Sequence, residues 1–330
     1  MPLSPIPAVT LTPVAYFPEK YFPENLAVRA DGSVLVTAVL QRELWCVPAP
    51  EPRTEVVPVL VHTFDHPVSG IVEVEPDVFI ISVTEGYTTY ESHLARVDLT
   101  DWTPGNRVSP EIIYTFDDRV HALNGSCLLA PGVMLVADCF AGLIWRIDLG
   151  EGARSATAGV WLAHDTMAMD PDSDVAPPPQ PGVNGVRYGT QSGYLWYTST
   201  AQKVFMRVAV DPETLDPAGA PEFVAAIDNA DDFCVDENAG FAYVTRHRAN
   251  TIDRVPLKPR HGSEVRHIAG DPFDEILIGP SSAAWSRGPA EPRRVAYVTT
   301  DGGTTAPPDG IVRKAALLRV ELRPPVNENS

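Results

Sequence analysis

Short apolar runs alternate with polar turns along the whole chain, and this alternation recurs six times. Each repeat begins at a polar or glycine-bearing turn and continues through three apolar runs, the third often ending near Arg-Val-Asp. The repeats start near residues 24, 68, 123, 183, 231 and 280, a spacing of 44 to 60 residues. The runs are rich in β-branched and aromatic residues, which favour strands, and no long amphipathic helix is evident.

A repeat of this length predicts an all-β chain that folds as a six-bladed β-propeller with a central channel. The prediction is one domain over residues 1–330, and the even spacing argues against the alternative of a two-domain sandwich. The run Val9–Val14 is expected to pair into the last blade and close the ring, which removes an open sheet edge. Five outermost strands are expected within Val56–Phe64, Glu111–Phe116, Ala158–Leu162, Glu222–Ala226 and Val265–Ala269.

The composition is consistent with a folded hydrophobic core and with short strands separated by turns. Hydrophobic residues make up 44% of the 330 residues, and many of the 33 prolines fall in clusters that suit turns between strands. Residues 164–181 form an insertion rich in Asp and Pro. This loop is expected either to cover the channel as a lid or to be a solvated connector.

The net charge and the absence of long apolar segments exclude several classes of function. The formal net charge of −18 argues against a nucleic acid partner, because phosphate binding needs clustered Lys and Arg. No apolar stretch is long enough to span a membrane, and the first residues do not resemble a secretory signal. The four cysteines show no paired spacing, so free buried thiols in a cytoplasmic protein that binds a small molecule are expected.

Polar residues stand near the start of four repeats: Glu24, Asn124, Asn184 and Asp231. The innermost strands of a propeller begin at one rim, so residues at these starts are expected to converge on the axis. The alternative is that the two asparagines only shape turns and the two acids make local backbone hydrogen bonds.

Through the motifs around these four residues, the chain resembles the senescence-marker-protein/gluconolactonase (regucalcin-like) family of six-bladed propellers, particularly its fungal branch. The motifs are Phe22–Val28, His121–Gly125, Gly182–Val186 and Ala230–Asp236, and the resemblance covers nearly the whole chain. It implies that Glu24, Asn184 and Asp231 coordinate one divalent cation, with Asn124 near the ion or the substrate. Oxygen donors of this kind suit Ca²⁺, Mg²⁺ or Mn²⁺.

The sequence also departs from the sugar-lactonase pattern. Ala122 stands where such lactonases often carry a substrate-binding arginine, and Asp232 stands where glycine is usual. Aromatic residues expected around the mouth favour an apolar, non-sugar substrate, although each could instead be a core residue. The candidate substrate-binding residues are Tyr21, Phe22, Phe140, Tyr188, Phe233, His247 and Trp285, and Tyr16, Phe17, Tyr87, Tyr90 and Trp161 are further rim aromatics.

The candidate catalytic residues are His121, Asn124 and Asp232. His121 lies beside the third-repeat asparagine, and histidine titrates near neutral pH, so it can act as an acid, a base or a hydrogen-bond donor. No Gly-x-Ser-x-Gly, dinucleotide or phosphate-loop motif is present.

Three functional hypotheses follow. The preferred one is secondary-metabolite biosynthesis, because the chain is similar to fungal hetero-Diels–Alderases of tropolone–sesquiterpenoid pathways. This similarity implies cycloaddition of a quinone-methide-like diene with a terpene, by proximity and hydrogen bonding and without a required cofactor. The alternative is a lactonase or esterase that depends on a divalent metal such as Ca²⁺. The third hypothesis is a non-catalytic binding propeller.

Overall fold

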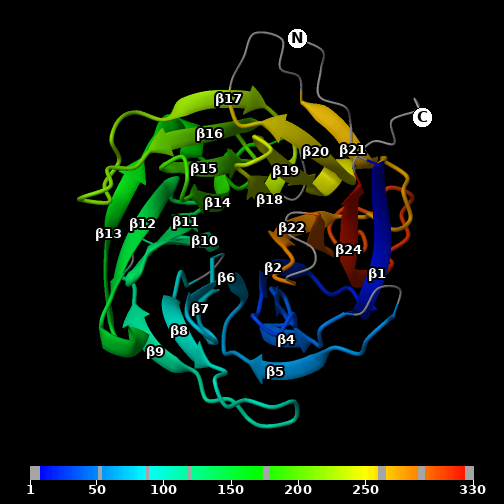
Figure 1. Cartoon of the computed structure of the whole chain (residues 1–330), viewed down its shortest axis with the longest axis horizontal. Coiled ribbons are helices and arrows are strands. Elements are labelled where there is room, and N and C mark those ends of the chain that lie inside the picture. Colours follow the sequence, from blue (N-terminus) through cyan, green and yellow to red (C-terminus); the bar gives the residue numbers. More distant parts are fainter. Residues whose placement is uncertain are drawn as a thin grey trace.

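The computed structural model describes residues 8–50, 54–86, 89–117, 120–173, 179–258, 265–288 and 294–323. These residues form six antiparallel sheets of four strands each. Figure 1 shows the sheets as blades arranged around a common centre. The chain is therefore an all-β, six-bladed propeller, as the sequence repeat predicts.

Within the first five blades, the strands follow one another outward from the centre in chain order. The strands of the first two blades are β2 (Pro23–Val28), β3 (Val34–Ala38), β4 (Glu43–Val47), β5 (Val59–Thr63), β6 (Val68–Glu75), β7 (Val78–Thr84), β8 (Ser92–Asp98) and β9 (Glu111–Thr115). Those of the next three are β10 (Leu123–Ala130), β11 (Val133–Asp138), β12 (Leu143–Leu149), β13 (Ala156–Ala163), β14 (Val183–Gly189), β15 (Tyr194–Ser199), β16 (Val204–Ala209), β17 (Glu222–Ala226), β18 (Ala230–Asp236), β19 (Phe241–Arg246), β20 (Thr251–Pro256) and β21 (Arg266–Gly270). All five predicted outermost strands are confirmed.

The sixth blade closes the ring with both ends of the chain. It contains β22 (Pro280–Trp285), β23 (Val295–Thr300) and β24 (Lys314–Arg323), and β1 (Ala8–Glu19) pairs antiparallel with β24 at the outer edge. Figure 1 shows β1 beside β24, so the first and last strands share one sheet. The predicted closure is confirmed, because Val9 to Pro13 pair with Leu322 to Leu318.

Buried apolar side chains gather between neighbouring blades rather than at the axis. Six clusters form, each shared by two adjacent blades; Leu44 and Phe79, for example, join the first blade to the second, and Phe205 and Phe233 join the fourth to the fifth. Burial of these side chains supplies the main stabilisation. This arrangement leaves the inner strand starts available for polar groups.

Threonine hydroxyl groups connect the inner ends of the blades. Thr198, on β15, accepts a hydrogen bond from the Gly185 N–H of its own blade and donates to the Asp231 carbonyl of the next blade. Thr37, Thr245 and Thr299 make the equivalent pair of bonds in the first, fifth and sixth blades. We call these four residues the threonine ring.

The described residues contain only three helical segments, each a single 3₁₀ turn: η1 (Glu151–Ala153), η2 (Asp165–Met167) and η3 (His247–Ala249). None of the helices in this part of the chain is long and apolar enough to cross a membrane. All four cysteines are buried and free, as predicted.

The insertion at 164–181 is described except for residues 174–178. It begins with η2, and Asp170 then pairs with Gln180 through two backbone hydrogen bonds. Thr166 hydrogen-bonds to the Tyr197 hydroxyl, which ties the loop to the fourth blade. The end of the loop lines the central cavity described below, through Pro179, Gln180 and Pro181. That the loop covers the channel as a lid stays a prediction.

Candidate functional site

Each innermost strand places its second residue at the same rim of the ring. These residues are Glu24, Ser69, Asn124, Asn184, Asp231 and Ser281, on β2, β6, β10, β14, β18 and β22. Just after the first residue, the pairing register of all six strands shifts. Such a bulge bends the strand and re-aims its side chains, which explains why one position supplies polar groups in every blade.

The Asn-Gly pairs of the third and fourth blades lie within strands, not turns. A side-chain carbon built at Gly125 would lie 2.5 Å from the Asn184 carbonyl oxygen, and one built at Gly185 would collide with the Asp232 carboxyl group. Glycine is needed here because the inner strands approach closely around the axis. The alternative that Asn124 and Asn184 only shape turns is therefore wrong.

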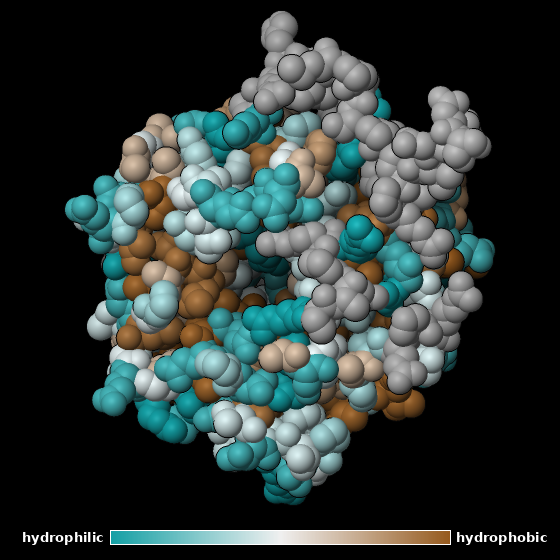
Figure 2. Space-filling view, in the orientation of Figure 1, coloured by the Kyte–Doolittle hydropathy of each residue, from teal (hydrophilic) through white to brown (hydrophobic). Residues whose placement is uncertain are grey.

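A cavity of about 420 Å³ opens at this rim. Figure 2 shows a hollow at the centre of the ring with hydrophobic residues gathered on one side. Seven of the predicted site residues line the cavity: Phe22, Glu24, Asn124, Phe140, Asn184, Asp231 and His247. Most other lining residues are apolar, among them Val39, Leu40, Val68, Ala122 and Leu123.

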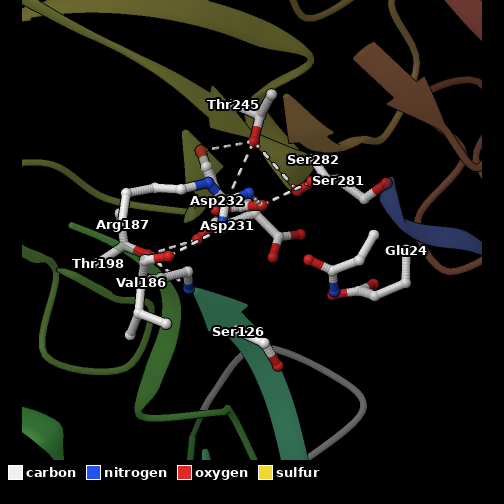
Figure 3. Close-up of polar contacts among 12 residues, drawn as sticks. Glu24, Ser126, Val186, Arg187, Thr198, Asp231, Asp232, Thr245, Ser281 and Ser282 are labelled. Atoms are coloured by element: carbon white, nitrogen blue, oxygen red, sulfur yellow. Dashed lines mark hydrogen bonds and ion pairs between the residues drawn. The ribbon is translucent and has the colours of Figure 1, made fainter. Parts of the chain in front are cut away.

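Glu24 and Asp231 bring two carboxyl groups into this cavity, and both residues are less than a tenth exposed. In Figure 3 the two carboxyl groups are directed into the same space between β2 and β18. Burial raises the pKa of Glu24 to about 7, although nearby His247 and a hydrogen bond with Asn124 oppose this rise. Burial and then the charge of Glu24 raise the pKa of Asp231 well above its usual value, while Asn184 lowers it. Two such groups favour a shared proton or a bound cation.

His247 enters the cavity from η3 and is held by a buried acid. Its Nε2 lies 3.2 Å from Oδ2 of Asp301, a carboxyl group that is fully buried and also accepts the N–H groups of Gly303 and Thr305. His247 and these N–H groups lower the pKa of Asp301 despite its burial. The Phe22 ring packs against the imidazole at 5.6 Å between centroids.

Four predicted substrate-binding aromatics do not line the cavity, so their placement at the mouth is wrong. Phe233 is fully buried and meets Phe205 edge-to-face between two blades. Tyr188 and Trp285 lie near the far ends of β14 and β22, and Trp285 donates its indole N–H to the Val235 carbonyl. Tyr21 packs edge-on against Trp45. Strand rise carries Tyr188 and Trp285 roughly 13 Å from the rim residue four positions earlier.

The further rim aromatics are also elsewhere. Phe17 and Trp161 are buried in the clusters between blades. Tyr16 and Tyr90 are exposed and do not line the cavity. Tyr87 lies outside the described residues.

Two of the three predicted catalytic residues also lie off the cavity lining. The His121 ring packs against Tyr90, at 5.0 Å between centroids, while its backbone N–H donates to the buried Asp138 carboxylate. Asp232 is buried under the rim, forms an ion pair with Arg187 and accepts a 2.6 Å bond from the Ser282 hydroxyl (Figure 3). Asn124 is the one predicted catalytic residue that lines the cavity. The Asp232 carboxyl group fills the space that Gly185 leaves in the fourth blade.

The donor set fits a hard divalent cation. Oδ1 of Asp231 is buried without a hydrogen-bond partner among the described residues, and Asn184 donates its Nδ2 to Thr200, 3.2 Å away. Within the described ranges, no three His, Cys, Asp or Glu side chains come close enough together to hold a metal ion. A cation would therefore need an amide oxygen, such as that of Asn184, beside the carboxylates of Glu24 and Asp231, and Ca²⁺ accepts such mixed oxygen ligands.

Sequence reasoning missed Asp301, Arg248 and the threonine ring. The ring carries a signal in the sequence, because the second strand of four repeats has threonine at the same register and a fifth has Ser82. Arg248 and Asp301 stand in connections between strands, where no repeat predicts which way a side chain points.

No protein-family model matches the chain, and no curated protein sequence matches it. Solved structures do. A luciferin-regenerating enzyme matches with a TM-score of 0.66 and 12% identity over 95% of both chains. The calcium-binding protein regucalcin of Agrobacterium tumefaciens matches with a TM-score of 0.61 and 15% identity, over 94% of this chain and 96% of that one. A candidate gluconolactonase matches with a TM-score of 0.60 and 13% identity, over 96% of this chain and 93% of that one.

These neighbours are regucalcin- and gluconolactonase-like six-bladed propellers, and at such low identities their likeness to this chain shows the fold alone.

Proposed function

We propose that the protein is an enzyme that hydrolyses a lactone or a related ester of a largely apolar small molecule. The observation that carries this proposal is the pair of buried carboxyl groups, Glu24 and Asp231, that line one cavity and have raised pKa values. Buried acids perturbed toward neutral pH are typical of proton-transfer sites. The cavity volume, about 420 Å³, suits a small ligand.

A divalent cation held by Glu24, Asn184 and Asp231 would polarise the substrate carbonyl group. The protein's own groups supply the proton transfers. Glu24 has a pKa of about 7 in the metal-free site, and a cation beside it would favour its ionised form, which can take a proton from a water molecule. The hydrogen bond with Asn124 holds its carboxyl group, and His247, fixed by Asp301, lines the same cavity and can form a hydrogen bond with the substrate.

The cavity walls favour an apolar substrate over a sugar. Phe22, Leu40, Val68 and Phe140 line the cavity, and Ala122 lines it at the position where sugar lactonases often carry arginine. Apolar walls exclude water and strengthen electrostatic interactions inside the cavity. We therefore expect medium-chain or aromatic lactones to be better substrates than gluconolactone.

The test is hydrolysis of a lactone panel by wild-type protein, Glu24→Gln and Asp231→Asn. With Ca²⁺, Mg²⁺ or Mn²⁺ present, wild type should open the apolar lactones, and each variant should lose about a hundredfold or more in kcat/KM. Glu213→Gln, an exposed acid, is the matched control and should keep full activity. Chelation should reduce turnover, and added cation should restore it. Absence of lactone opening under all these conditions would overturn the proposal.

A second candidate is the cycloaddition implied by the resemblance to fungal hetero-Diels–Alderases, and the apolar cavity walls are the observation in its favour. None of the structural neighbours described above supports this chemistry. Such a reaction needs orientation of two reactants and hydrogen bonding, not a cation. Incubation with a quinone-methide precursor and humulene should then give an adduct that resists chelation, while no lactone opens.

A further inference from the structure

Arg248 places a guanidinium group on the cavity wall, where it has no hydrogen-bond or ion-pair partner among the described residues. It belongs to η3 and lines the cavity together with Glu24 and Asp231. Its residue is partly buried, and burial lowers the pKa of its side chain, while Asp301 and Asp231 raise it through charge. Across the described part of the chain, no residue forms a hydrogen bond or ion pair with this guanidinium group.

This lack of a partner distinguishes Arg248 from its neighbours. Arg246, two residues earlier, is paired with Asp228 and with Asp253. Arg187, under the rim, is paired with Asp232. Arginine is rarely removed from water unless a counter-charge or hydrogen-bond acceptor replaces its hydration. An unpaired guanidinium group beside a cavity therefore indicates an acceptor that arrives with a ligand.

The charges around the cavity identify the kind of acceptor. Asp301 is already bonded to His247 and to backbone N–H groups. Glu24 and Asp231 are both buried and direct their carboxyl groups into the same space, so a proton or a cation between them satisfies this pair (Figure 3). Arg248 is the charged group of this lining whose N–H donors are bonded to no described residue, although the lining also carries Glu24, Glu85 and Asp231. One planar carboxylate of a ligand would accept these donors. Arginine's fork of N–H groups matches a carboxylate, which can accept two of them at once.

We propose that Arg248 anchors the substrate by its carboxylate, so that the substrate class is an apolar acid carrying the lactone or ester. This inference deepens the proposed function and rests on it for the reaction, though not for carboxylate binding itself. The guanidinium group comes from the fifth blade, whereas the third-blade position of the sugar-lactonase arginine is Ala122.

Binding of a matched ligand pair tests this assignment without any turnover. The probes are 4-phenylbutyrate and the neutral amide 4-phenylbutyramide, titrated calorimetrically into wild type, Arg248→Gln and Arg154→Gln. Arg154 is exposed and paired with Glu111, away from the cavity lining, so its variant is the matched control. Each titration is done with EDTA and again with Ca²⁺.

Wild type and Arg154→Gln should bind the carboxylate about ten- to a hundredfold more tightly than the amide, the range of hydrogen bonds to charged groups. Arg248→Gln should bind the two probes equally. If wild type shows no preference for the carboxylate, or if Arg248→Gln keeps the preference with either EDTA or Ca²⁺, the assignment of Arg248 is overturned.

A second measurement uses only the wild-type chain, in case Arg248→Gln does not fold. Phenylglyoxal modifies accessible arginines, and peptide mass mapping reports each site. Phenylbutyrate, but not phenylbutyramide, should protect Arg248, whereas equal modification with both would contradict the proposal. If the protein binds the carboxylate through Arg248 but opens no lactone, the proposed hydrolysis is overturned and the assignment of Arg248 is supported. If the protein opens lactones but shows no preference for the carboxylate, the assignment of Arg248 is overturned and the proposed hydrolysis is supported.

Discussion

Glu24 illustrates how one buried side chain links stability to chemistry. Its carboxyl group is removed from water at the start of β2, and burial raises its pKa to about 7 from an ordinary value of 4.5. Without a cation, the protonated form is therefore the favoured one in the folded protein below about pH 7. The same shift that suits Glu24 to proton transfer near neutral pH makes its ionised form costly.

This cost predicts a pH-dependent stability that Glu24→Gln removes. The folded-state pKa lies above the unfolded value, so the stabilisation is complete below about pH 4.5 and is lost as the pH rises through about 7. Between pH 5 and pH 8, the free energy of unfolding of metal-free wild type should fall by roughly 2–3 kcal/mol more than that of Glu24→Gln. Urea unfolding in EDTA at both pH values measures the difference. Glu213→Gln should behave like wild type, and an identical pH dependence in Glu24→Gln would contradict the assignment.

At the scale of elements, the innermost strands are fixed by hydroxyl groups from the strands beside them. Each residue of the threonine ring bonds to the bulge of its own blade and to the rim carbonyl of the next. The carbonyls held in this way include those of Glu24 and Asp231. The ring thus positions the backbone from which both carboxyl groups project.

Removal of one hydroxyl group from the ring should destabilise the fold. Thr198→Val leaves the Asp231 carbonyl and the Gly185 N–H without this partner, so we expect a loss of about 1–3 kcal/mol in the free energy of unfolding. Thr157→Val, on the exposed strand β13, is the matched control and should change stability by less than about 0.5 kcal/mol. Equal effects from the two substitutions would show that the ring does not contribute in this way.

On the scale of the whole molecule, closure of the ring joins the two ends of the chain. β1 covers the edge of β24, which would otherwise expose unpaired N–H and C=O groups. The six apolar clusters each need both adjacent blades, including the one between the sixth blade and the first. Loss of β1 would therefore also weaken the packing between the sixth blade and the first.

Truncation tests this closure. Deletion of residues 1–19 removes all of β1, so we expect loss of cooperative thermal unfolding or aggregation through the β24 edge. Deletion of residues 1–7 keeps all the pairings between β1 and β24 and serves as the control. Circular dichroism melting and light scattering report the outcomes. A 1–19 deletion that melts like wild type would show that the ring is stable without the strand.

The sequence by itself determined the repeat, and the repeat determined the architecture. Short β-branched runs at a spacing of 44 to 60 residues have few compact solutions, because each four-stranded blade must bury its faces against two others. The same repeat located the rim positions Glu24, Asn124, Asn184 and Asp231, since equivalent residues of equivalent strands meet at one rim. The pairing of Val9–Val14 with the last blade followed from the need to cover an edge.

Only the tertiary structure decided which way individual side chains point. Phe233 and Trp285 satisfy the same aromatic pattern as Phe22 and Phe140, yet the first two pack between blades and the latter two line the cavity. His121 turns to Tyr90 although its neighbour Ala122 faces the cavity. Arg246 forms ion pairs with two acids, whereas Arg248 forms none with any described residue. These outcomes depend on bulges, strand twist and the contacts of loops from distant blades, none of which local sequence spacing specifies.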